Sequence, residues 1–486
     1  MRILRNIFLF FLPAVAVALA SCTDDEDFST SQRDVLTFST DTISFDTLFS
    51  RTPSSTRTFW VYNKSSAGIR CSSIRLANGN QTGYRVNVNG VFLGEKQGYQ
   101  LNNEEIRKGD SLRVFIELTS AENGSATPQE VSDRIDFLLE SGVSQSVQLK
   151  AYSWDALKLK APVFSRDTIL TSDKPIVING MAKVEEGVTL TLPAGTTLYM
   201  DYDSGIEVCG TLLCLGEAGK EVTLRSSRLD RMFDNLLYDE VSGQWRGIVF
   251  REKSFGNRIE HTDIHAACDA IVCDSSDTER EKLHVSSSTI HNNKGYGIVA
   301  ENCRITIDNS QVSNTLRNCI GLLGGMTTIN HTTIAQFYPL SADRGSALLF
   351  SDATDTAQYP NSSLLVRNSI ITGYANEEYL EIFSDSTTAE ARIEYSLLRG
   401  KEREDSLRFP NVIYENAEDT ASAGYRNFRN DLEVYDFRLK KTSKAVDAAD
   451  PTTSLPLDRN ALPRDEKPDM GCYEYIAEEE EETEKN

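Results

Sequence analysis

The sequence predicts an all-β protein in which a β-sandwich is followed by a parallel β-helix. Two observations predict the β-helix: a six-residue pattern recurs seven times in the middle of the chain, and β-branched residues alternate with polar ones beside it. A third observation predicts the sandwich, because eight short apolar runs separated by turn residues occupy residues 35–155. Repeats of this size are typical of solenoids, in which each coil buries its apolar edge against its neighbours.

The repeat consists of an apolar residue, any residue, a small polar or aromatic residue, Ser or Thr, any residue and a final apolar residue. Its copies begin at Leu224, Ile259, Val285, Ile307, Ile329, Val366 and Ile393. Alternation, as at Ile305 and Ile307, favours strands over helices, and the Leu-x-x-Leu-x-Leu signature of leucine-rich repeats is absent. We therefore expect a β-helix over residues 160–475, with room for about 12 to 14 coils.

The Ser or Thr at the fourth position predicts a column of corner hydroxyls that bond backbone groups of adjacent coils. The residues at this position are Ser227, Thr262, Ser288, Ser310, Thr332, Ser369 and Ser396. Opposite charges on successive copies predict ion pairs between coils, each contributing a few tenths of a kcal/mol. The expected pairs are Arg225 with Glu260, Arg228 with Asp263, and Arg367 with Glu394.

The eight runs in residues 35–155 have the length and spacing of antiparallel strands. They cover residues 35–38, 42–45, 58–62, 73–76, 84–88, 112–118, 134–138 and 147–152, with turn residues such as Asn89-Gly90 between them. About seven or eight strands in this length predict an immunoglobulin-like fold. We expect this module to act as a spacer or docking module, because nothing in it suggests a catalytic site.

Several segments carry a resemblance to a known family. Residues 184–198, 205–212 and 243–248 resemble the opening coils of the β-helix surface lipoproteins of Bacteroidota, and residues 436–439, 444–448 and 468–475 are similar to their closing segment of the choice-of-anchor Q type. The chain departs from that closing pattern at Lys444, Ala449 and Cys472. The resemblance implies a right-handed, pectate-lyase-like β-helix behind an immunoglobulin-like module, and it specifies a fold far better than an activity.

The first 34 residues have the features of an exported lipoprotein. Arg2 and Arg5 precede an apolar run over residues 7–20, which is too short to span a membrane and fits a signal peptide over residues 1–21. Leu19-Ala-Ser-Cys22 resembles a lipobox, which implies that Cys22 is lipidated and anchors the chain in the outer membrane. The acidic run in the tether, residues 22–34, resembles the signal for display on the cell surface.

The remaining eight cysteines and the net charge narrow the function classes. Interior packing of these thiols is favoured over a disulfide or zinc, because the evenly spaced pairs Cys209/Cys214 and Cys268/Cys273 lie in apolar strand segments. The formal charge of −22 and the absence of a basic stripe exclude a nucleic-acid partner. The acidic residues 476–486 predict a disordered tail. An acidic surface also disfavours anionic glycans unless a local basic cleft exists.

Candidate sites are few. Trp245, Arg246, Arg251 and Lys253 form the most site-like cluster, although the Trp-x-Gly-Ile pattern also resembles a structural coil motif. No cofactor is expected; calcium at Asp201/Asp203 or Asp274/Asp277 is conceivable, but solvated turns explain these acids as well. His261 and His331 occupy the variable third position and predict corners, His265 and His291 are expected in turns just past the repeat, and His284 is expected to face outward.

Three functions stay open on the sequence. The leading hypothesis is a non-catalytic surface lipoprotein whose β-faces bind glycans or outer-membrane proteins. The first alternative is a polysaccharide lyase or glycoside hydrolase, and the second is an adhesin or accessory subunit of an outer-membrane assembly. An enzyme should show a groove in which charged groups from three successive coils converge, a glycan binder should show aromatic platforms, and a subunit should show an apolar patch. The loops over residues 230–245 and 341–360 are the places to look first.

Overall fold

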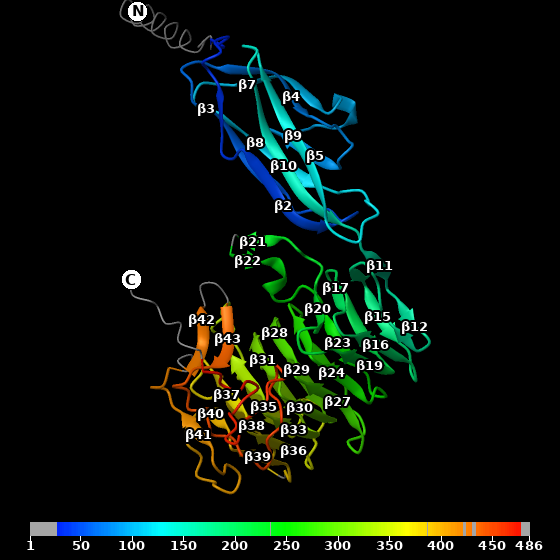
Figure 1. Cartoon of the computed structure of the whole chain (residues 1–486), viewed down its shortest axis with the longest axis vertical. Helices are drawn as coiled ribbons and strands as arrows, with labels where there is room; N and C mark the ends of the chain where they lie inside the picture. Colours follow the sequence, from blue (N-terminus) through cyan, green and yellow to red (C-terminus); the bar gives the residue numbers. More distant parts are fainter. Residues whose placement is uncertain (1–26, 234, 386, 421–423, 430–433, 478–486) are drawn as a thin grey trace, which may run out of the picture. The chain divides into compact units, whose positions relative to one another are not determined.

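The computed structural model describes residues 27–477 except residues 234, 386, 421–423 and 430–433 (Figure 1). The chain divides into two compact units between Asp155 and Ala156. The predicted signal peptide and residues 22–26 of the predicted tether, Cys22 among them, lie outside the described residues, as does most of the predicted acidic tail. Among the described residues, none belongs to a helix that is long and apolar enough to cross a membrane.

The N-terminal unit is a sandwich of two five-stranded sheets, as the sequence predicts. One sheet has the order β1 (Leu36–Phe38), β3 (Arg57–Asn63), β8 (Ser111–Leu118), β5 (Tyr84–Val88) and β6 (Val91–Phe92). The other has the order β2 (Thr42–Phe49), β10 (Ser144–Trp154), β9 (Gln129–Leu139), β4 (Ile69–Leu76) and β7 (Gln100–Ile106), and a 3-10 turn, η1 (Glu95–Gln97), precedes β7. Alternate residues of these strands point inward and form one apolar core.

The C-terminal unit is a parallel β-helix built from three long sheets, which we call sheet 1, sheet 2 and sheet 3 (Figure 1). Sheet 1 has eleven strands: β11 (Leu157–Lys160), β14 (Ile176–Asn179), β17 (Thr197–Met200), β20 (Val222–Ser226), β25 (Thr262–His265), β28 (Thr289–Asn293), β31 (Gln311–Thr315), β34 (Thr333–Gln336), β37 (Ile370–Gly373), β40 (Leu397–Arg399) and β41 (Ile413–Glu415).

Sheets 2 and 3 have nine strands each. Sheet 2 contains β12 (Val163–Phe164), β15 (Met181–Val184), β18 (Gly205–Val208), β23 (Gly247–Phe250), β26 (Ile271–Cys273), β29 (Ile298–Glu301), β32 (Ile320–Leu323), β35 (Leu348–Ser351) and β38 (Tyr379–Ile382). Sheet 3 contains β13 (Thr168–Ile169), β16 (Thr189–Pro193), β19 (Thr211–Leu215), β24 (Asn257–Glu260), β27 (Glu281–Ser286), β30 (Arg304–Asp308), β33 (Met326–Asn330), β36 (Ser363–Arg367) and β39 (Glu390–Glu394). Branched aliphatic side chains from all three sheets fill the interior.

The repeat is the corner between sheet 3 and sheet 1. Its third position has a left-handed backbone in all six copies from Ile259 onward, with φ between 40° at His261 and 50° at Asn368. The fourth-position hydroxyls are buried and accept backbone N–H groups from the coil before: Ser288 Oγ from Thr262 at 3.0 Å, and Ser310 Oγ from Ser288 at 3.1 Å. The predicted hydroxyl column is therefore confirmed from Thr262 to Ser396.

The first predicted copy does not belong to this column. Leu224 pairs in register with Ile264 in sheet 1, whereas Ile259 pairs with Val285 in sheet 3. Ser227 instead donates to Asp201 Oδ1 at 2.6 Å. The error arises because apolar alternation looks the same on both sides of a corner, so one isolated copy does not fix its own register.

One of the three predicted ion pairs between coils is found among the described residues, and two are not. Arg367 pairs with Glu394 at 3.5 Å, as expected for two copies that stack. Arg225 contacts Asp239 instead of Glu260, and Arg228 contacts Asp230 at 2.6 Å instead of Asp263. Both failures follow from the misplaced first copy.

The chain stops coiling after β41, so sheet 1 has eleven strands, fewer than the about 12 to 14 coils predicted. The hairpin β42 (Tyr425–Arg429) and β43 (Val434–Leu439) and the residues that follow form a closing segment against the outer face of sheet 1. Phe437, Met470 and Cys472 from this segment pack with Phe337 and Ile370. The segment resembling a closing motif thus covers a side of the β-helix as well as following its last coil.

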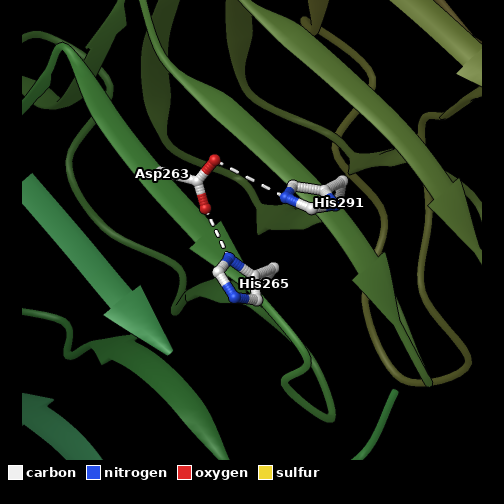
Figure 2. A group of neighbouring side chains, drawn as sticks. All are labelled: Asp263, His265 and His291. Atoms are coloured by element: carbon white, nitrogen blue, oxygen red, sulfur yellow. Dashed lines mark hydrogen bonds and ion pairs between the residues drawn. The ribbon is translucent and has the colours of Figure 1, made fainter. Parts of the chain in front are cut away.

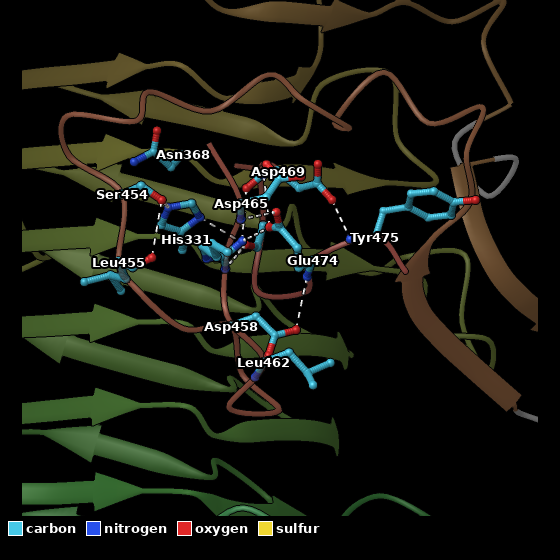
Figure 3. Close-up of polar contacts among 12 residues, drawn as sticks. His331, Asn368, Ser454, Leu455, Asp458, Leu462, Asp465, Asp469, Glu474 and Tyr475 are labelled. Atoms are coloured by element: carbon cyan, nitrogen blue, oxygen red, sulfur yellow. Dashed lines mark hydrogen bonds and ion pairs between the residues drawn. The ribbon is translucent and has the colours of Figure 1, made fainter. Parts of the chain in front are cut away.

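Buried polar contacts hold the closing segment in place (Figure 3). His331 Nε2 contacts Ser454 Oγ at 2.7 Å, and Glu474 donates its backbone N–H to Asp458 at 3.1 Å. Arg464 pairs with Glu474 at 2.9 Å, where both side chains are almost fully buried. The first contact joins the closing segment to the β-helix, and the other two hold the closing segment itself together.

Candidate functional site

The outer face of sheet 1 carries a row of polar side chains on three successive coils. Because side chains alternate along a strand, Asp263 and His265 on β25 share the outward face with Thr289 and His291 on β28. The register places Asp263 beside Thr289 and His265 beside His291, and it continues this second row to Ser313 on β31. The polar row follows directly from the parallel pairing of identical strand positions.

A pocket of about 520 Å³ lies over this row, and we call it the sheet 1 cleft. One wall is the inserted loop with β21 (Arg231–Phe233), β22 (Leu236–Leu237) and the 3-10 turn η2 (Tyr238–Glu240), one of the two loops that the sequence indicated. The opposite wall is the closing segment. The lining residues are Arg231, Asn235, Leu236, Leu237, Glu240, Thr289, His291, Asn292, Gln311, Ser313, Asn314, Tyr435, Arg459 and Tyr473. Asn292 donates to Glu240 at 2.7 Å and so ties the loop to the sheet.

Asp263 lies between two imidazoles, one of which, His291, lines this cleft (Figure 2). Its Oδ1 contacts His265 Nδ1 at 2.5 Å, and its Oδ2 lies 3.5 Å from His291 Nε2. The two rings are tilted against each other with centroids 4.9 Å apart. On its other side, His265 Nε2 contacts Asp239 Oδ2 at 3.1 Å, and Asp239 also contacts Arg225.

The charges of this group reinforce each other. Burial acts to lower the pKa of His265, but the Asp263 charge and hydrogen bonds to Asp239 and Asp263 outweigh it and raise that pKa to about 10. Burial acts to raise the pKa of Asp263, yet the two histidines hold it well below its usual value. These contacts favour a positive charge, a proton or another cation, between His265 and an ionised Asp263 carboxylate.

Arg459 provides a cation on the opposite wall. Its Nη1 donates weakly to Asn460 at 3.4 Å, and its buried Nε has no hydrogen-bond partner in the part of the chain that the structure describes. Among the described residues, no carboxylate forms an ion pair with this guanidinium. Next to it, Tyr473 donates its hydroxyl to Gln311 at 2.9 Å. A guanidinium without a carboxylate partner in a cleft is able to bind an anionic group of a ligand.

In the structure, the aromatic residue of the predicted binding cluster is buried and its three cations are paired with acids. Trp245 is 1% exposed and donates its indole N–H to the backbone oxygen of His265 at 2.8 Å, so its ring does not face solvent. The three cations are exposed and each is paired with an acid: Arg246 with Asp203, Arg251 with Glu207 and Asp274, and Lys253 with Glu186. Trp245 thus contacts the histidine site from beneath, and ligand binding by the three cations stays a prediction.

The histidines separate into corner and site residues. His261 and His331 are corners with left-handed backbones, as predicted, and His284 pairs with Asp308 at 3.0 Å on sheet 3. The expectation of turns for His265 and His291 is wrong, because both lie inside strands of sheet 1. The signal was available: both follow aligned apolar residues by one position, so parallel pairing stacks them.

The acids considered for calcium have protein partners. Asp203 and Asp274 form the ion pairs described above, Asp201 accepts the Ser227 hydroxyl, and Asp277 pairs with Arg280 at 3.0 Å. All eight cysteines after Cys22 are free. Six are buried, which confirms interior packing for them, whereas Cys209 and Cys268 are partly exposed.

A second pocket of about 560 Å³ lies between the β42–β43 hairpin and residues 460–476. It is lined by four cations, among them Lys440 and Lys441, but only by residues of the closing segment. The sheet 1 cleft differs from it in that successive coils of the β-helix line its floor. We therefore take the sheet 1 cleft as the candidate site.

Comparisons with known proteins show little beyond the fold. No family model matches the chain, and no curated protein matches it. Among solved structures, the chain is similar to pectate lyase Pel9A (12% identity, 66% of this chain and 88% of that one, TM-score 0.29). It is also similar to the catalytic unit of a GH87 α-1,3-glucanase from Streptomyces thermodiastaticus (10% identity, 75% and 90%, TM-score 0.26).

A further match is the Vibrio cholerae VesB protease (9% identity, 24% of this chain and 31% of that one, TM-score 0.17). The chain therefore spans less than a third of the length of that protease. At these identities and TM-scores, none of the three likenesses bears on activity.

Proposed function

We propose that this protein binds an acidic saccharide in the sheet 1 cleft. The single observation that carries the proposal is the Arg459 guanidinium, which faces the cleft without a carboxylate partner among the described residues. A uronate carboxylate would form a charge-assisted, bidentate pair with it. On a chain with a formal charge of −22, such a local cation is what an anionic ligand requires.

The rest of the cleft suits the neutral parts of a sugar. The floor presents the hydroxyls of Thr289 and Ser313 and the amide of Gln311, which match the donors and acceptors of sugar hydroxyls. Tyr435 and Tyr473 add aromatic surface at the closing-segment wall. Polar groups that fix the orientation of a ligand, next to aromatic surface, are found in small-ligand pockets.

A second candidate function, cleavage of the bound saccharide, is favoured by one observation. His291 lines the cleft and lies 3.5 Å from Asp263 Oδ2, and histidine is the side chain that most often acts as a general base. Proton abstraction next to a uronate carboxylate held by a cation is the chemistry of a polysaccharide lyase. The groove criterion for an enzyme is met in part, since three successive coils contribute to the site and its surroundings.

The cellular setting is also a proposal. The lipobox-like sequence before Cys22 and the acidic run after it support a lipid-anchored protein displayed on the outer-membrane surface. Such a location would expose the sheet 1 cleft to extracellular glycans.

A binding screen with a product assay tests the proposed function. The soluble chain lacking residues 1–22 is titrated with polygalacturonate, alginate and chondroitin sulfate, with neutral dextran as the comparison, in the presence of a chelator. We expect at least one acidic polymer to bind and dextran not to bind. Release of unsaturated products would establish the second candidate, and absence of binding to every acidic polymer would contradict the proposal.

A further inference from the structure

Asp263, His265 and His291 present three potential metal-ligand atoms that all lie within 4.8 Å of one another. The atoms are set by the fold, because Asp263 and His265 share the outward face of β25 and His291 is the register partner of His265 on β28. Figure 2 shows the carboxylate and both rings converging on a common region. No loop has to reorganise to bring them together.

The ring of His265 is oriented from behind by a carboxylate. Its Nε2 contacts Asp239 Oδ2 at 3.1 Å, which leaves Nδ1 facing Asp263. Asp239 is 2% exposed, and its Oδ1 has no hydrogen-bond partner within the described ranges. A carboxylate that accepts from the far nitrogen of an imidazole is the usual means by which proteins orient a metal-bound histidine. Arg225 contacts Asp239 and fixes it in turn.

The near side of this ring requires a positive centre. When Nε2–H donates to Asp239, Nδ1 carries a lone pair directed at a carboxylate oxygen 2.5 Å away, so a proton or a cation must separate the two atoms. A proton joins only this pair and leaves His291 Nε2 3.5 Å from Asp263 Oδ2, longer than a good hydrogen bond. One metal ion would engage all three groups at once.

We propose that Asp263, His265 and His291 form a binding site for a divalent transition metal of the zinc class. Two imidazole nitrogens and one carboxylate oxygen suit Zn²⁺ or Co²⁺, whereas Ca²⁺ and Mg²⁺ prefer sites made of oxygen alone. Because His291 lines the sheet 1 cleft, a fourth coordination position would open toward that cleft. The inference does not depend on the proposed function, since metal binding is measured without a saccharide.

Titration of the chelator-treated soluble chain with Zn²⁺ and Co²⁺ tests the site. We expect one strong site per chain by calorimetry, and Co²⁺ absorption bands of the intensity that a four-coordinate site gives. His291→Gln should weaken Zn²⁺ binding at least about 100-fold, and Asp239→Asn about 10- to 100-fold through the orientation of His265. Circular dichroism establishes that each variant is folded.

His284→Gln is the matched control, because His284 also pairs with an aspartate, at 3.0 Å, but on sheet 3 and without a second imidazole. We expect it to bind Zn²⁺ like the unmodified chain. The proposal is overturned if the chain lacks a strong site, or if His291→Gln binds Zn²⁺ as tightly as His284→Gln. If the unmodified chain binds an acidic saccharide in the presence of a chelator but binds neither Zn²⁺ nor Co²⁺, the metal-site inference is refuted and the proposed function stands.

Discussion

Replacement of Ser288 by Ala tests the hydroxyl column that organises the β-helix. Ser288 is fully buried, and its Oγ accepts the Thr262 N–H at 3.0 Å and lies 2.8 Å from the Ser286 carbonyl oxygen. The change leaves the Thr262 N–H buried without a partner, which costs about 1–3 kcal/mol. That cost corresponds to an about 5- to 150-fold larger equilibrium constant for opening of the local structure.

Hydrogen exchange of peptides that cover residues 259–266 measures this opening directly, because the affected amide lies within them. Ser286→Ala is the control: Ser286 lies two residues before Ser288 in the same coil, and no hydrogen bond of its side chain is found among the described residues. We expect the control to change local stability by no more than about 0.5 kcal/mol. Equal exchange in the two variants would refute the structural role assigned to the column.

Three further predictions concern the closing segment and the thiols. Burial lowers the pKa of His331 to about 3, so the stability that His331 contributes is full above about pH 6.5 and should fall as the pH drops. His331→Asn should remove about 2 kcal/mol of this loss at about pH 5. A flatter pH dependence of the urea midpoint would show this. Arg464→Met strands the buried Glu474 and should cost about 3–5 kcal/mol, with faster exchange confined at first to the closing segment; unchanged exchange there would contradict this. In the native soluble chain lacking Cys22, a thiol reagent should modify only Cys209 and Cys268, and rapid labelling of the others would show that they are not buried.

The sequence predicts most of the architecture, because each coil of a β-helix repeats the same short pattern of apolar and polar residues. Ser288 and Ser310 stand at one position of a fixed period, and the fold places them in one column. The sandwich is predicted for the same reason, except for two edge strands, β6 and β7. β6 has only two residues, and β7, with the sequence Gln-Leu-Asn-Asn-Glu-Glu-Ile, lacks apolar alternation. The register of the copy at Leu224 is not predictable in this way, since it has no second copy at its own spacing.

The candidate site depends on contacts that the repeat does not encode. Asp263, His265 and His291 fall on one face through parallel pairing, which is readable once the register is known. Arg459 lies in the same cleft as His291 only because the chain reverses after β41 and covers sheet 1. The sequence repeat does not predict that reversal. Asp239 lies on an inserted loop whose fold against His265 is likewise set by tertiary packing.

The affinity of the Arg459→Met variant for acidic saccharides tests the central claim most directly. Loss of a charge-assisted pair should weaken binding of oligogalacturonate or alginate oligomers about 10- to 150-fold. Arg258→Met removes the same charge from sheet 3, where Arg258 pairs with Glu260 at 2.9 Å, and should leave the affinity unchanged. Equal affinities of Arg459→Met and Arg258→Met would contradict the claim that the sheet 1 cleft recognises the acidic group.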